Sequence, residues 1–320
     1  MSLGDYYGPS NEQRGPNLRL VGAIILAVIS IGIYSFQTQV NPVTGEKQHI
    51  SMSPSDEKAL GLQAAPQMAE QMGGAIDPNR DPRARLVEEV GRKLVRLSDA
   101  RKSDYADNYN FYLLNDPNTI NAFALPGGQV FFTLGLFEKM DTEAQLAGVL
   151  GHEIGHVVGR HSAAQMAKGQ LGQMLTLAVG IGASGERDNG RNAQLVAAMV
   201  NQMTQLRFGR ADESQSDEFG LRYMAQAGYD PSEMLQVMRI LKEASGGRNP
   251  PEFLATHPLP ETRLNEIQAR LEKEYPDGIP SNLTKGRSLH GDLGSGASSS
   301  KGVRDSLEEI RRRLESGSAR

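Results

Sequence analysis

The chain has 320 residues, enough for one substantial domain with appendages; 38% of them are hydrophobic and only 6% aromatic, with no Trp. This composition favours a helix-rich domain built on Ala, Leu, Val and Met over a β-sandwich. A net charge of −4 without a dominant basic patch argues against nucleic acid as a partner. Because the chain has no Cys, disulfides, thiolate metal sites and acylated lipoprotein anchors are excluded, and any transition metal must use His and carboxylate ligands.

The N-terminal region predicts a tail followed by a membrane anchor. Residues 1–19 are polar and rich in Gly, Pro and Asn, which is typical of disorder. Residues 20–36 form an uncharged apolar run of about the minimum length for a transmembrane helix. No cleavage site with small residues follows it, so we predict a permanent anchor rather than a cleaved signal peptide. Arg14 and Arg19 precede the run, which favours a cytoplasmic N-terminus and a body outside the cytoplasm.

Residues 40–278 carry the signals of one mainly α domain with a small β-sheet, an α+β fold. Residues 111–114 and 129–132 read as short strands, and residues 121–128 as a strand that ends in a Pro-Gly-Gly turn. A helix is predicted to start at Thr142, with Gln145 as its capping-box partner, and to run past His161.

The C-terminal region predicts flexible segments. Residues 279–300 are loop-like and end in a run of Gly and Ser, which indicates a flexible linker. The tail over residues 301–320 has apolar residues at the spacing of a short amphipathic helix, although such tails are more often solvated and mobile.

The segment Gly151-His-Glu-Ile-Gly-His156 carries the strongest chemical signal. His152 and His156 stand four residues apart, so on a helix their imidazoles project from the same face. Two converging imidazole nitrogens make half of a tetrahedral Zn²⁺ site. Glu153 follows the first of them and projects beside the metal, where a carboxylate can take a proton from the hydrolytic water and deliver it to the leaving amine.

A catalytic zinc ion needs a third protein ligand and one open position. The metzincin pattern would place it ten residues after His152, but that position is Ser162, and His161 is one residue short. The downstream pair Glu213 and Asp217 lies four residues apart on one face of a helix that runs to about Gln226. We therefore predict Glu213 as the third ligand and Asp217 as the acceptor that orients a ligand imidazole.

Three segments together resemble the HtpX-like and CAAX-prenyl-protease-like zinc metallopeptidases: His152-Glu-Ile-Gly-His156, Glu213-xxx-Asp217 and Asn121-Ala-Phe-Ala-Leu-Pro-Gly-Gly128. Asn41-Pro-Val-Thr-Gly45 and Thr256-His-Pro258 also resemble elements of their bacterial envelope and mitochondrial inner-membrane members. The resemblance covers roughly residues 40–275. It implies a gluzincin domain with one zinc ion per chain, endopeptidase activity and a role in protein quality control at a membrane.

Two further features are interpreted with the help of this resemblance. Asn121, Ala122 and Phe123 are expected to form an edge strand beside the metal that pairs with an extended substrate. His257 lies in a Pro-rich loop and is by default a surface histidine. The alternatives are that it polarises the scissile carbonyl, or that it occupies the open metal position as a gate, which is our hypothesis.

The sequence therefore predicts a single-pass zinc endopeptidase of a bacterial inner membrane that faces the periplasm and cleaves unfolded or damaged envelope proteins. A chaperone or assembly factor with a gated, rarely active zinc site is the main alternative. A structural zinc protein is the third reading, and it would require His257 or His161 as a permanent fourth ligand.

Overall fold

The computed structural model describes residues 18–180, 207–246, 251–258 and 261–290, with side chains at 18–20, 172–180 and 261 left undescribed. The predicted N-terminal tail through residue 17 and the predicted C-terminal tail over residues 301–320 lie outside these ranges. The elements in chain order are α1 (Leu18–Phe36), β1 (Thr38–Val40), β2 (Lys47–His49), α2 (Pro54–Gln71), α3 (Pro82–Leu97), η1 (Asp99–Lys102), β3 (Asn110–Leu114), β4 (Ala122–Leu125), β5 (Gln129–Thr133), α4 (Leu134–Phe137), α5 (Glu143–Val158), α6 (His161–Gly180), α8 (Arg210–Gln226), α9 (Glu233–Ser245), α10 (Phe253–Thr256) and α11 (Glu261–Glu274).

The described strands form two small sheets within a mainly helical body, as the composition predicted. In the larger sheet the strand order is β3-β5-β4, with β3 parallel and β4 antiparallel to the central strand β5. Every residue of β5 is buried, because α2 packs on the sheet and α5 lies against β4 and β5. Strand β4 is therefore an edge strand beside the helix that carries His152 and His156.

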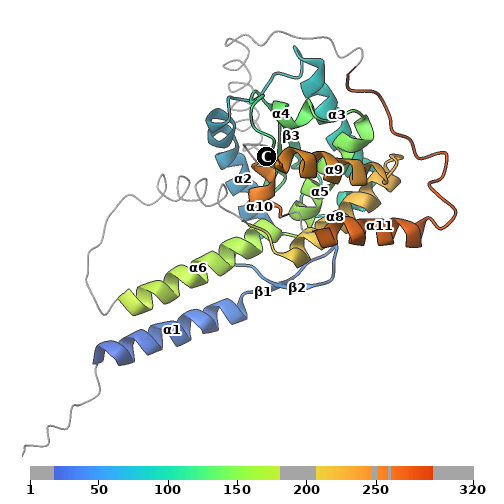
Figure 1. Cartoon of the computed structure of the whole chain (residues 1–320). Coiled ribbons are helices and arrows are strands. Elements are labelled where there is room, and N and C mark those ends of the chain that lie inside the picture. Colours follow the sequence, from blue (N-terminus) through green and yellow to red (C-terminus); the bar gives the residue numbers. More distant parts are fainter. Residues whose placement is uncertain (1–17, 181–206, 247–250, 259–260, 291–320) are drawn as a thin grey trace, which may run out of the picture.

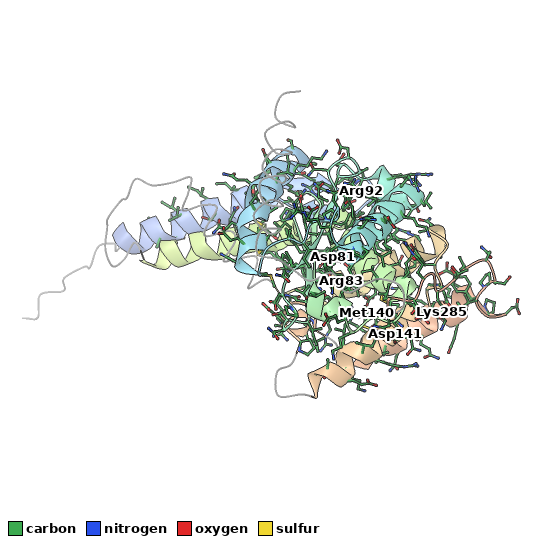
Figure 2. All side chains as sticks on the ribbon, turned by 90° about the horizontal axis from the view of Figure 1, so that it is seen from above. Asp81, Arg83, Arg92, Met140, Asp141 and Lys285 are labelled. Atoms are coloured by element: carbon green, nitrogen blue, oxygen red, sulfur yellow. The ribbon has the colours of Figure 1, made fainter. Side chains whose placement is uncertain are left out.

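The helices begin where the sequence places capping side chains. Ser53 and Asp56 form a reciprocal capping box at the start of α2. Asp81 accepts a hydrogen bond from the backbone N–H of Arg83 at the start of α3 and also pairs with the Arg83 guanidinium, 2.7 Å away, so the two side chains lie together in Figure 2. At α5, Thr142 accepts from the Gln145 backbone, and the Gln145 side chain accepts from the backbone of Asp141.

Helices α5 and α8 approach each other closely because small residues line their contact. A Cβ atom on Gly151 would lie 3.2 Å from the Cα of Gly220, and one on Gly155 would lie 3.0 Å from the Cα of Ser216. Both distances are shorter than ordinary contacts with a Cβ atom, so larger residues would force the helices apart. This close packing brings the side chains of the two helices to a common point in the core.

The helix with the two histidines is shorter than the sequence predicts. It ends at Val158, and Arg160 has a φ of 55°, in the left-handed region that non-glycine residues rarely adopt. A new helix, α6, starts at His161, so the prediction of one helix running past His161 is wrong. The Arg160 side chain is buried and pairs with the buried Glu57 and with Gln39, interactions that offset the backbone cost.

Residues 279–290 of the predicted linker lie against the domain. The first free N–H groups of α5, at Glu143 and Ala144, donate to the carbonyl groups of Arg287 and Lys285. In Figure 2 this C-terminal segment brings Lys285 close to the Asp141 end of α5. Residues 291–300 lie outside the described ranges, so the flexible linker stays a prediction there.

Helix α1 leaves the body and packs along α6, and both views show the pair projecting from the domain (Figures 1 and 2). Eight large apolar side chains of α1 are more than two-fifths exposed: Val21, Ile24, Ile25, Val28, Ile29, Ile31, Ile33 and Phe36. Within the described residues, however, no helix combines the length and the apolar character that crossing a membrane requires. The predicted anchor over residues 20–36 is thus a helix, and its membrane-spanning role is not confirmed.

Candidate metal centre

Helices α5 and α8, together with the residue that follows α10, bring four buried side chains to one point. Their candidate ligand atoms all lie within 4.8 Å of one another: His152, His156, Glu213 and His257. The Nε2 atoms of His152 and His156 are 3.0 Å apart. The Glu213 carboxylate faces both, at 3.6 Å from His152 and 3.5 Å from His156. Burial lowers the pKa of His156 well below its usual range, which keeps this imidazole neutral with a lone pair available for a metal.

The second carboxylate of α8 orients His152. The Oδ1 atom of Asp217 lies 2.9 Å from His152 Nδ1, so this nitrogen carries the proton and Nε2 is left with the lone pair. Burial acts to raise the pKa of Asp217, but the charge of Arg263 and the hydrogen bond from His152 outweigh it and lower the pKa. This hydrogen bond joins the two residues that the prediction paired, and the roles of Glu213 as ligand and Asp217 as its support stay predictions.

Arg263 of α11 is a central residue that the sequence analysis missed. Its guanidinium binds Asp217 through two hydrogen bonds of 2.8 and 2.7 Å and lies 2.6 Å from Glu213. It also donates to the carbonyl group of Pro258, next to His257. One buried cation therefore links Glu213 and Asp217 to the loop that carries His257. No spacing rule in the sequence connects it to residues so far away along the chain.

Glu153 is buried beside the cluster and is not among the four residues whose ligand atoms converge. Its Oε1 atom is buried without a hydrogen-bond partner and lies 3.7 Å from His257 Nε2, which has no hydrogen-bond partner either. Burial raises the pKa of Glu153 above its usual value, a direction that makes a carboxylate a better proton acceptor.

His257 reaches the cluster from the short helix α10. Its Nδ1 atom is 3.0 Å from Glu213 and 3.3 Å from His152 Nε2. Its ring stacks on Phe253, with centroids 4.4 Å apart, and lies beside Phe208 on its other flank, at 5.1 Å. The surface position that would be the default for a histidine in this loop is therefore wrong. Neither aromatic neighbour was predicted.

His161 also lies at the cluster, although the sequence analysis placed it on another part of a continuous helix. The turn at Gly159 and Arg160 directs it back, so that its Nδ1 atom is 3.0 Å from Nδ1 of His156. It is not among the four residues whose ligand atoms converge.

The predicted edge-strand residues lie where β4 begins. Asn121 and Ala122 are buried and Phe123 is half-buried, with its ring stacked on Phe131 of β5 at 4.9 Å. The Oδ1 atom of Asn121 is buried and has no hydrogen-bond partner. Ile120, just before the strand, accepts a hydrogen bond from the backbone of Phe253, so the start of this edge adjoins α10.

The donor set and the charge of the cluster fit a divalent transition metal. Imidazole and carboxylate ligands are those that zinc uses in proteins without thiolates. Three buried carboxylates, Glu153, Glu213 and Asp217, face the single guanidinium of Arg263, which leaves an excess of negative charge in the core. A bound dication would neutralise this excess, whereas uncompensated buried charge is costly.

Comparison with known proteins identifies similar chains. The family model described as Peptidase family M48 matches residues 82–271. The beta-barrel assembly-enhancing protease of Escherichia coli (strain K12) is 30% identical over 283 residues, which cover 83% of this chain and 56% of that protein. The mitochondrial metalloendopeptidase OMA1 of Schizosaccharomyces pombe is 28% identical over 253 residues, covering 77% of this chain and 72% of that protein. The chain thus spans just over half of the bacterial relative's length.

Proposed function

The chain belongs to peptidase family M48, and from this premise we propose that it is a zinc-dependent endopeptidase in which His152, His156 and Glu213 hold the metal. The single observation that carries the proposal is the convergence of these ligand atoms in the core beside Glu153. The family and the cluster also confirm zinc as the cofactor predicted from the sequence. When bound, zinc polarises the scissile carbonyl group and makes water a stronger acid.

Glu153 moves the protons of the reaction. Its unpartnered Oε1 atom faces the cluster from a buried position, so it can accept a proton from water and pass it to the leaving amine. Burial keeps the carboxylate away from competing solvent. Asp217 and Arg263 act on the ligands instead: the hydrogen bond between His152 and Asp217 fixes the His152 ring, and the ion pair with Arg263 holds the carboxylate of Glu213.

The substrate binds as an added strand along β4. Among the strands that the structure describes, β4 pairs with β5 alone, so the backbone groups of its other edge can pair with an extended peptide. Helix α5 packs against β4, which supports a position for the scissile bond near Glu153. Asn121, with its unpartnered side-chain oxygen, offers one further acceptor at the start of the edge.

His257 acts as a gate in this proposal. It occupies the fourth side of the cluster, where a catalytic zinc site keeps an open position. A backbone hydrogen bond from Phe253 to Ile120 connects α10 to the start of β4. Displacement of α10 would therefore expose both the metal site and the free edge of β4. In the His257→Ala variant we expect faster cleavage of peptides and weaker zinc binding. Unchanged values of both would refute the gate.

We assign the enzyme to protein quality control at a bacterial inner membrane, with unfolded or damaged envelope proteins as substrates and a periplasmic catalytic domain. The support is the similarity to a protease named for enhancing β-barrel assembly and to a mitochondrial metalloendopeptidase. The exposed apolar side chains of α1 support attachment to the membrane through this helix. The second candidate is a chaperone with a rarely active zinc site, which the position of His257 over the metal cluster favours.

The test compares the full chain with its Glu153→Gln variant, measuring zinc content and the cleavage of unfolded casein. The peptidase proposal predicts equal zinc in both proteins and cleavage by the wild type alone. Equal zinc with cleavage by neither protein would contradict it and favour the chaperone. Cleavage by both would refute the assignment of Glu153 as the base.

A further inference from the structure

The side of His156 that faces away from the cluster has no carboxylate partner of its own, unlike the corresponding side of His152. Its Nδ1 atom instead lies 3.0 Å from Nδ1 of His161. Two facing ring nitrogens at this distance form a hydrogen bond only when one carries the proton and the other carries a lone pair. The direction of this bond therefore decides which nitrogen of His156 is free for a metal.

A chain of hydrogen bonds that starts at the surface fixes the direction. The Glu46 carboxylate can only accept, so the atom of Gln215 that lies 3.0 Å from it is the amide nitrogen. The amide oxygen of Gln215 then faces Nε2 of His161, 2.8 Å away, and this nitrogen must carry the proton. In a neutral His161 the other nitrogen, Nδ1, is left with the lone pair and accepts from His156. The hydroxyl of Ser216 lies 3.3 Å from the same nitrogen and can donate to it.

We infer that Glu46, Gln215 and His161 form a positioning relay that holds His156 in the tautomer with a proton on Nδ1 and a bare Nε2 facing the metal. The inference rests on the proposed role of His156 as a zinc ligand. The relay orients His156 as Asp217 orients His152. The difference is that the imidazole of His161 and the amide of Gln215 lie between His156 and the carboxylate of Glu46.

The relay makes the β1–β2 hairpin part of the metal centre. Besides Glu46, this hairpin contributes Asn41 and Gln48, whose amide groups donate to the carbonyl groups of Val158 and Gly159 at 2.7 and 2.6 Å. These bonds hold the turn that directs His161 back onto His156. In Figure 1, β1 and β2 lie between the α1–α6 pair and the body of the domain, so the segment next to α1 supports a ligand of the active site.

The experiment alters Gln215 in the full chain. Gln215→Leu removes both the acceptor for His161 and the donor to Glu46. Gln226→Leu is the matched control, because Gln226 belongs to the same helix and its amide also bonds a carboxylate, that of Asp99 at 3.0 Å, away from the metal. Zinc affinity is measured by competition with a chromogenic chelator. The protonated nitrogen of each ring is identified by nitrogen–proton correlation spectra of protein with isotope-labelled histidine, of which the chain has only six.

The relay predicts zinc binding roughly 10- to 100-fold weaker in Gln215→Leu, near wild-type affinity in Gln226→Leu, and a proton on Nδ1 of His156 in the wild type. Equal affinity in Gln215→Leu and Gln226→Leu, with zinc on Nε2 of His156 in both, would overturn the relay and leave the proposed function intact. A wild-type spectrum in which zinc does not affect His156 would instead overturn the ligand assignment itself.

Discussion

Replacing Gly155 with Ala tests whether the close packing of α5 and α8 sets the geometry of the metal centre. The added Cβ atom would lie 3.0 Å from the Cα of Ser216, 3.1 Å from its carbonyl oxygen and 3.1 Å from the Cβ of Phe219. Two of these atoms belong to the backbone, so relief requires α8 to move, and Glu213 moves with it. Overpacking of this kind costs about 1–3 kcal/mol.

Gly148→Ala is the matched control, about two turns earlier on α5. Its Cβ atom would meet the sulfur atoms of Met234 and Met224 at 3.4 and 3.5 Å, which are ordinary contacts. Both substitutions gain helix propensity, worth about 1 kcal/mol. Gly148→Ala is therefore expected to be more stable than wild type, and Gly155→Ala less stable than Gly148→Ala by roughly 1–3 kcal/mol.

Stability of the metal-free proteins is measured by urea unfolding, and zinc affinity by chelator competition. The account predicts that Gly155→Ala also binds zinc more weakly, because displacement of α8 separates Glu213 from the two histidines of α5. Equal stability and equal zinc affinity of the two variants would refute the reasoning that this contact sets the spacing of the ligands.

Three further substitutions test separate parts of the structure. Asp217→Asn replaces the carboxylate that orients His152 with a neutral amide, so zinc affinity should fall roughly 10- to 100-fold in chelator competition. An unchanged affinity would contradict this role of Asp217. Arg160→Ala removes the guanidinium that pairs with the buried Glu57, to which the Tyr105 hydroxyl still donates, and should cost about 3–5 kcal/mol in urea unfolding, whereas Arg92→Ala at an exposed pair should cost at most about 1 kcal/mol. Burial acts to raise the pKa of Glu143, but the hydrogen bonds from Arg287 and Tyr229 outweigh it and lower this pKa below 4.5. The ionised Glu143 therefore contributes fully to the free energy of unfolding above pH 4.5, and this contribution is lost as the pH falls through the folded-state pKa. Glu143→Gln should therefore lower stability at neutral pH by roughly 1.5–3 kcal/mol and reduce the loss on acidification; parallel stability curves for variant and wild type would contradict it.

The sequence predicted the elements whose signals are local. The capping pair Thr142 and Gln145 marked the start of α5. The i, i+4 spacings on α5 and α8 identified His152, His156, Glu213 and Asp217, because such pairs share one face of a helix in any fold. Their convergence across two helices is what the structure adds.

The residues that sequence reasoning missed depend on contacts between distant segments or on one unusual backbone angle. Arg263 reaches Asp217 only because α11 packs near α8, a relation that no periodicity encodes. His161 faces His156 because Arg160 adopts a positive φ, an angle that its residue type does not predict. The bonds from Asn41 and Gln48 to the end of α5 stabilise this turn, and they join positions more than a hundred residues apart.

The zinc bound per chain in Glu213→Ala and Glu218→Ala gives a direct test of the metal centre. Both residues belong to α8, but Glu213 is buried in the cluster whereas Glu218 is exposed and pairs with Arg270. The account predicts one zinc ion per chain in the wild type and in Glu218→Ala, and at least roughly tenfold weaker binding in Glu213→Ala. Zinc bound as tightly by Glu213→Ala as by Glu218→Ala would contradict the proposed metal centre.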